Sequence, residues 1–171
     1  MTLTPGPSID ASLKDSQVDC VLTYRQLDVQ KIVASVQDVT AGATAIFIGT
    51  TRDSFKGKIV TRLEYQSYSA VAIKTMFSIG HDAIKTISRS DYQPIDLINN
   101  PSMIRCAIHH RLGTVPIGEP SIVIVVSSPH RKEAFVICEE ILEEVKKKAQ
   151  IWKREYYEGE NESEAEWKAN N

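Results

Sequence analysis

The fold of this chain is decided around residues 122–131, which read IVIVVSSPHR. The unbroken run of β-branched residues at 122–126 predicts a strand that is covered on both faces and therefore lies centrally in a sheet. The following Ser-Ser-Pro predicts a helix, with Ser128 as its N-cap and Pro129 at its first position. Apolar residues recur at helical spacing from position 134 to 145. This region is therefore a central strand that leads into an amphipathic helix.

Further elements are predicted on both sides of this unit. Asp28 and Ser69 mark the starts of two more helices with apolar residues at helical spacing. Further strands are predicted over residues 18–24, 42–48, 59–65 and 103–109, and residues 90–102 are expected to form a surface loop. The pattern predicts one α+β domain with a mixed or antiparallel sheet packed by helices. We expect a disordered leader over 1–17, the folded domain over 18–157 and an acidic tail over 158–171.

Composition excludes several classes of protein. The chain has 171 residues, 42% of them hydrophobic and 25% charged, with a formal net charge of −2. No apolar run is long enough to span a bilayer, and the slightly acidic total gives no general attraction to nucleic acid. The three cysteines, Cys20, Cys106 and Cys138, are far apart and form neither a disulfide framework nor a zinc motif. We therefore expect a cytosolic protein without a membrane or nucleic-acid partner.

The first candidate for binding chemistry is the basic pair His130 and Arg131 at the predicted helix start. A helix N-terminus already carries positive potential and free N–H groups, so added cations favour an anion such as phosphate there. The alternative is a solvated and slightly unfavourable helix start. The spacing alone leaves both interpretations open.

The second candidate is the basic run at positions 146, 147, 148, 153 and 154. Glu143 and Glu144 stand four residues before Lys147 and Lys148, so these two lysines are expected to form ion pairs. Lys146 and Lys153 have no such partner and would lie about 10 Å apart on one face of an unbroken helix. They could supply a nucleophile or base, although a solvated charged face is the more frequent explanation of such a run.

The third candidate is Arg52, which follows a predicted strand end and could clamp an anion; alternatively, it is an exposed loop residue paired with Asp53. His109 and His110 point to opposite faces of a strand and cannot hold one metal ion together. No common nucleotide-binding or hydrolase motif is present. We therefore expect no metal and no cofactor, and the remaining chemistry is anion recognition by fixed cations.

Ordered motifs from Gly42 to Lys168 resemble the large, catalytic subunit of molybdopterin synthase. They are Phe47-x-Gly49-x-x-Arg52-Asp53 with Gly57-Lys58, Leu63-Glu64-Tyr65-x-x-Tyr68, His110-Arg111-Leu112-Gly113-x-Val115-Pro116-x-Gly118-Glu119, Ser127-Ser128-Pro129-His130-Arg131, and Lys146 ahead of Ile151-Trp152-Lys153-Arg154-Glu155.

The resemblance implies an α/β hammerhead fold and a sulfurtransferase of molybdenum cofactor biosynthesis. The family inserts sulfur into cyclic pyranopterin monophosphate, from the C-terminal thiocarboxylate of a small ubiquitin-like subunit. Two large subunits form a dimer with one small subunit at each end, which makes a heterotetramer. Carried over by motif, the catalytic residues are Lys146 and Lys153. The substrate-binding residues carried over are these two lysines with Arg52, His130, Arg131, Arg154 and Glu155.

The sequence departs from the family pattern at Gln66, Val71 and Gln150. A proline is usual at position 150 and would break the helix, whereas glutamine permits the helix to continue towards Lys153. Two other functions stay open at this point. The basic residues could form a stripe that binds RNA phosphates, or the chain could be a catalytically idle scaffold for the same small partner.

Overall fold

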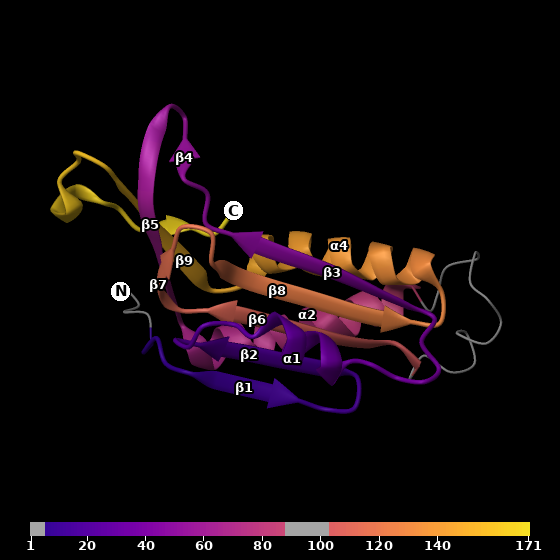
Figure 1. The fold of residues 1–171 in the computed structure, drawn as a ribbon. Coiled ribbons are helices and arrows are strands. Elements are labelled where there is room, and N and C mark those ends of the chain that lie inside the picture. The colour runs from indigo at the N-terminus through magenta and orange to yellow at the C-terminus, as the bar shows by residue number, and fades with distance from the viewer. Residues whose placement is uncertain (1–5, 88–102) are drawn as a thin grey trace.

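The computed structural model describes residues 6–87 and 103–171, and a five-stranded sheet forms its centre (Figure 1). The strand order is β1 (Ala11–Lys14), β2 (Val18–Thr23), β6 (Arg105–Arg111), β8 (Pro120–Ser128) and β3 (Ala43–Thr50). Strands β2 and β6 are parallel, and the other neighbours are antiparallel. The predicted mixed sheet is confirmed.

Helices cover both faces of this sheet. Helices α2 (Ser69–Ile87) and α4 (Arg131–Lys148) pack on one face, and the short α1 (Val29–Ser35) packs on the other (Figure 1). Strand β8 is buried along both faces, as predicted, because Ile122 and Ile124 belong to the larger apolar core while Val123 belongs to the core under α1. In α2, a Cβ at Gly80 would lie 2.8 Å from Val18 Cγ1, so the glycine allows the helix to approach the sheet closely.

A second sheet stands at one end of the first (Figure 1). Its strand order is β10 (Lys168–Ala169), β9 (Ile151–Tyr157), β5 (Lys58–Ser67) and β4 (Ser54–Phe55), and β7 (Gly113–Pro116) also pairs with β5. A short 3₁₀ helix, η2 (Glu162–Glu164), lies between β9 and β10. The C-terminal end of α4 points towards this second sheet, whereas its N-terminal end lies at the far end of the molecule (Figure 1).

The N-terminal region differs from the expected disordered leader. Residues 11–14 form β1, which pairs along β2. The Asp10 carboxylate accepts a hydrogen bond from the backbone N–H of Tyr24 at 2.9 Å, and the N–H of Ile9 donates to Ser69 Oγ at 3.0 Å. Few apolar residues mark this segment in the sequence, and its order comes from backbone pairing with an otherwise open sheet edge. Residues 1–5 and the expected surface loop at 90–102 lie outside the described residues.

The helix boundaries of α4 also differ from the prediction. Its N-cap is His130 rather than Ser128, because Ser128 is the last residue of β8 and is fully buried in the strand. At the other end the helix does not continue through Gln150. It ends at Lys148, and Ala149 has an extended conformation with ψ 137°. Lys146 therefore lies in α4 and Lys153 in β9, and the continuous helix that Gln150 would permit is not formed.

Tertiary contacts explain this helix end without a proline. The carbonyl of Gln150 accepts a hydrogen bond from the N–H of Tyr68 at 3.0 Å, and its side-chain oxygen accepts one from Thr75 Oγ1 at 2.9 Å. Directly after it, Ile151 pairs with Ser67 and begins β9. Strand pairing with β5 thus outweighs the continuation of the helix. Over the described residues, no helix has the length and apolar character needed to cross a membrane.

Candidate functional site

A cavity of about 200 Å³ lies where the two sheets and the end of α4 meet. Its walls come from the end of β3 and the loop after it, from β5, β6 and β8, and from α4, β9 and the residues after β10. The polar lining residues are Thr50, Arg52, Ser54, Tyr65, His110, Ser121, Lys146, Lys153, Glu155 and Asn170. Segments far apart in the sequence thus meet at one hollow.

Lys146 enters this cavity from the last turn of α4. The negative end of the helix dipole favours cations in that turn. Its neighbours Lys147 and Lys148 both pair with Glu144, the first at 3.8 Å. Within residues 6–87 and 103–171, no carboxylate lies within ion-pair distance of Lys146. Its positive charge is therefore available to a ligand.

Lys153 reaches the same cavity from β9 and lies beside Glu155, two residues further along the same face of the strand. Lys153 Nζ is 3.6 Å from Glu155 Oε1, and Lys168 Nζ is 3.8 Å from Glu155 Oε2. Burial alone would raise the pKa of Glu155, but the Tyr157 hydroxyl and the two ammonium groups outweigh it and hold this pKa below its usual range. Glu155 is thus an ionised anchor for Lys153.

Arg52 is the third cation of the cavity and comes from the loop between β3 and β4. Its Cζ lies 5.7 Å from the ring centroid of Phe55, and no ion pair with Asp53 is found in the described part of the chain. The interpretation of Arg52 as a residue paired with Asp53 is therefore not supported. The described lining holds three cations, Arg52, Lys146 and Lys153, against the single carboxylate of Glu155.

Three other predicted site residues lie away from this cavity within the chain. Arg154 points to the opposite face of β9, where its Nη2 lies 3.2 Å from Glu64 and its Cζ lies 4.5 Å from the Trp167 ring. His130 and Arg131 are exposed at the start of α4. Lys146 follows Arg131 by fifteen positions in this helix, a distance of about 22 Å along the axis. One chain alone does not bring these groups together.

The cavity also contains residues that the sequence analysis did not assign to a site, above all His110, Tyr65 and Asn170. The sequence placed His109 and His110 on opposite faces of a strand, without indicating which of them faces a site. No sequence signal points to Asn170, which reaches the cavity because β10 pairs with β9. No group of potential metal ligands is found among the described residues.

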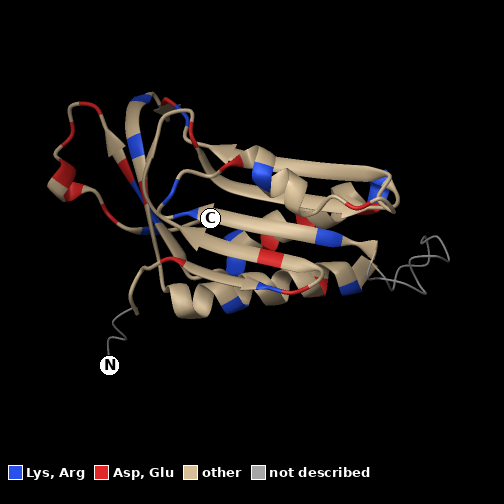
Figure 2. Cartoon of the chain, turned by 60° about the horizontal axis from the view of Figure 1, so that its bottom comes forward, with Lys and Arg blue, Asp and Glu red and all other residues tan. Residues whose placement is uncertain are grey.

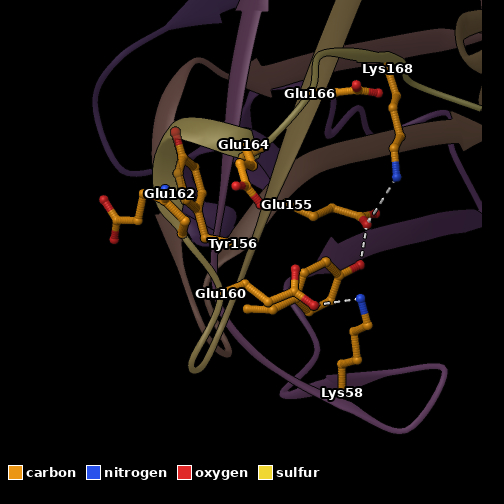
Figure 3. A pocket seen from close by; sticks show the side chains of 11 residues that line it. Lys58, Glu155, Tyr156, Glu160, Glu162, Glu164, Glu166 and Lys168 are labelled. Atoms are coloured by element: carbon orange, nitrogen blue, oxygen red, sulfur yellow. Dashed lines mark hydrogen bonds and ion pairs between the residues drawn. The ribbon is translucent and has the colours of Figure 1, made fainter.

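A second hollow of about 240 Å³ shares Glu155 with the first but has the opposite charge (Figure 3). Five carboxylates line it, at positions 155, 160, 162, 164 and 166, against the ammonium groups of Lys58 and Lys168. Figure 2 shows the acidic residues along the loop that carries residues 158–166. With five carboxylates against two ammonium groups, this hollow is less favourable for an anion than the cavity with Lys146.

Residues 22–148 match the family model described as MoaE protein. The chain belongs to this family. It is 42% identical over 164 residues to the molybdopterin synthase catalytic subunit of Phaeosphaeria nodorum, covering 96% of this chain and 78% of that relative. It is 46% identical over 149 residues to the subunit of the same name from Pyricularia oryzae, covering 87% of this chain and 72% of the relative. The resemblance stated from the motifs is confirmed.

Solved structures of this family share the fold. Molybdopterin synthase from Staphylococcus aureus aligns with a TM-score of 0.72 at 26% identity, covering 86% of this chain and 94% of that one. A chain from the complex of subunits 1 and 2 of the Helicobacter pylori molybdopterin-converting factor aligns with a TM-score of 0.60 at 23% identity, covering 84% and 86%. The second likeness concerns the fold alone.

The three departures from the MoaE motifs lie outside the cavity lining. Gln66 is exposed on β5, and Val71 is 37% exposed in the first turn of α2. Gln150 forms the tertiary contacts that end α4, so it performs the helix-ending role expected of a proline. The cations that the motifs identify at 52, 146 and 153 therefore meet despite these changes.

Proposed function

We propose that this MoaE protein transfers sulfur to cyclic pyranopterin monophosphate and so forms the dithiolene of molybdopterin. The sulfur comes from the C-terminal thiocarboxylate of a small ubiquitin-like carrier subunit, as the family resemblance implies. The observation that carries the proposal is the convergence of Arg52, Lys146 and Lys153 on one cavity with a single carboxylate. A cavity with this charge allows two anionic groups to bind next to each other.

The reaction brings a thiocarboxylate to a ring that already carries a phosphate. Two negative charges 4 Å apart repel by about 4 kcal/mol at the effective dielectric of a protein surface. Fixed cations offset this repulsion and stabilise charge that develops as sulfur attacks the ring. Each transfer replaces one oxygen of the pterin precursor by sulfur and leaves a carboxylate on the carrier. One dithiolene therefore needs two equivalents of carrier.

The environments of the two lysines suggest different roles. Lys146 has no carboxylate partner among the described residues, so it is suited to orient the thiocarboxylate or to form a transient acyl link with the carrier's end. Lys153 is held by Glu155, so it is suited to charge stabilisation or proton transfer at a fixed position. Arg52 contributes a planar guanidinium that matches a phosphate.

His130 and Arg131 enter this proposal through a second copy of the chain. They are exposed and about 22 Å from Lys146 along α4, so within one chain they cannot touch a ligand in the cavity. In the dimer of large subunits that the family resemblance implies, a partner copy can supply them. Arg154, paired with Glu64, would then hold the second sheet in place instead of touching substrate.

A mixed dimer tests this arrangement. Dimers formed from Lys146→Ala and Arg131→Ala chains contain one cavity with both defects and one with neither, if Arg131 acts across the dimer. About half of the wild-type activity is then expected per purified mixed dimer, while the homodimers of each variant keep very little activity. Inactive mixed dimers would place both residues in one chain's site and contradict the arrangement.

The activity itself is tested by mixing the purified chain with a thiocarboxylated carrier and the pterin precursor. Mass spectrometry is expected to find product in which sulfur replaces oxygen, and a chain that yields none would be a scaffold without catalysis. The RNA-binding alternative gains no support, because Arg131 and the basic run lie at opposite ends of α4. Salt-dependent retention of RNA would revive it.

A cytosolic location is part of the proposal. Cys20, Cys106 and Cys138 are all unpaired and buried. Burial raises the pKa of each thiol, so these cysteines are unreactive. Free thiols fit a reducing compartment.

A further inference from the structure

His110 is a cavity residue to which the sulfur-transfer proposal gives no role. It lies on β6 with 1% of its surface exposed, and its ring stands edge-on to Tyr65 with 4.9 Å between the ring centroids. Both rings line the cavity that holds Arg52, Lys146 and Lys153. A buried polar ring at this position requires an explanation in terms of its hydrogen bonds.

The hydrogen bonds of His110 fix which nitrogen carries the proton. Nδ1 lies 2.8 Å from the carbonyl oxygen of Arg111, which can only accept, so Nδ1 is the protonated nitrogen and donates. Burial lowers the pKa of His110 to about 4, so the ring is neutral at pH 7. Nε2 therefore bears a lone pair and acts as an acceptor.

Asn170 shows that a donor can reach this lone pair. Its Nδ2 lies 3.2 Å from Nε2, and Asn170 itself lines the cavity. Asn170 follows the short strand β10, which pairs with β9 through Lys168 and Ala169, and its own N–H donates to the carbonyl of Ile151 at 3.3 Å. A contact held by so short a strand can give way to a ligand at small cost.

Acceptors of this kind are scarce in the described lining. Arg52, Lys146 and Lys153 only donate, and the Thr, Ser, Tyr and Asn side chains can donate as well as accept. Besides His110 Nε2, the described lining has one other side chain that only accepts, the carboxylate of Glu155. This carboxylate already accepts a hydrogen bond from Tyr157 and forms ion pairs with Lys153 and Lys168. His110 thus offers a neutral acceptor among cations.

We propose that His110 Nε2 accepts a hydrogen bond from an N–H or O–H group of the heterocyclic substrate, replacing the Asn170 amide and setting the orientation of the ring in the cavity. This inference rests on the proposed function, because it assigns one more contact to the same pterin precursor. The cations bind the anionic groups, whereas a neutral acceptor distinguishes a ring that presents a donor from one that does not.

The test measures binding of cyclic pyranopterin monophosphate to purified wild-type and variant chains by calorimetry. His110→Phe keeps a ring against Tyr65 but removes the acceptor, so the dissociation constant is expected to rise about ten-fold. His110→Gln, which can place a carbonyl oxygen near the position of Nε2, is expected to restore part of the affinity. Asn170→Ala is expected to bind at least as tightly as wild type, since a competing donor is removed.

The matched control is His109→Phe, because His109 lies next on the same strand but faces the other way, 3.4 Å from Asp19. Its precursor affinity is expected to equal that of wild type. Equal affinities of wild type and His110→Phe, or loss of binding in Asn170→Ala, would overturn the inference. A wild-type chain that binds no precursor would instead overturn the proposed function, and the inference with it.

A second measurement does not depend on the folding of a variant. In the wild-type chain labelled with ¹⁵N-histidine, NMR is expected to show a protonated Nδ1 and an unprotonated Nε2 for His110. Adding precursor is expected to shift the Nε2 resonance of His110 and to leave that of His109 unchanged. A precursor that binds without moving the Nε2 resonance would refute the contact.

Discussion

The two hollows that share Glu155 differ in charge although they are of similar size, about 200 and about 240 Å³. The first gathers Arg52, Lys146 and Lys153, and most of the charged residues that line the second are carboxylates. Net charge does not reveal this division, because the chain as a whole carries only −2. The cations come from α4, β9 and the loop after β3, whereas most of the carboxylates come from the segment after β9. The difference teaches that local charge, set by which segments meet, selects the ligand.

The largest effect is expected when Lys146 is removed, because this cation of the first hollow has no carboxylate partner among the described residues. Lys146→Ala is expected to lower product formation by about 10²–10³-fold, the range typical for loss of one preorganised electrostatic group. The reconstituted sulfur-transfer assay measures it. Lys147→Ala is the matched control, because Lys147 pairs with Glu144 at 3.8 Å and is expected to stay near wild-type activity. Near-normal turnover of Lys146→Ala would remove this lysine from the mechanism.

The second prediction concerns Glu155, the residue common to both hollows. Glu155→Gln loosens Lys153 and Lys168, so activity is expected to fall about ten-fold, and the free energy of unfolding at pH 7 to fall by about 1–2 kcal/mol. Turnover assays and denaturant unfolding measure these effects, with Glu158→Gln as the exposed control.

The stability effect of Glu155→Gln depends on pH with a defined sign. The pKa of Glu155 is lowered in the folded chain, so its ionised form stabilises the fold above the ordinary glutamate pKa of about 4.3. That contribution is lost as pH falls through the lowered folded value. The free energies of unfolding of wild type and variant are therefore expected to differ at pH 6 and to become equal in strong acid. A difference in the free energy of unfolding that stays constant down to pH 2 would contradict a stabilising role of ionised Glu155.

A smaller effect is expected from the contact that holds the C-terminal segment against the second sheet. The Trp167 ring lies 4.5 Å from Arg154 Cζ, a cation–π contact of about 0.5–1 kcal/mol at an exposed site. Trp167→Ala is expected to speed amide hydrogen exchange at residues 168–170 a few-fold while β5 keeps its protection. Unchanged exchange at these residues would show that β10 holds the segment without Trp167.

The smallest effect is expected from the acidic hollow. The double variant Glu164→Gln, Glu166→Gln reduces its negative charge, and no ion pair of either residue is found in the described part of the chain. Its sulfur-transfer rate is expected to stay within about two-fold of wild type, since an anionic substrate avoids this hollow. A large change would mean that the acidic segment takes part in binding substrate or carrier.

The sequence predicted the helices and central strands well because their signals are local. The apolar run at 122–126, the Asp28 cap and the apolar spacing after Ser69 each reflect burial or hydrogen bonding within a few residues. Asp28 indeed caps its helix, since its side chain accepts a hydrogen bond from the N–H of Lys31 at 3.1 Å. The motif residues Arg52, Lys146 and Lys153 all line one cavity, and their roles in binding and catalysis stay predictions.

The tertiary structure alone decided how those residues meet. The residue type of Gln150 does not indicate a helix end. After α4 ends at Lys148, Gln150 instead bonds to Thr75 of α2 and to Tyr68, which directly precedes α2. The same contacts turn Lys153 from a helical position into a strand position opposite Tyr65. Asn170 reaches His110 over 60 positions of sequence. Residue types, capping and periodicity are local properties of a chain, whereas pairing between distant strands depends on which surfaces become buried together.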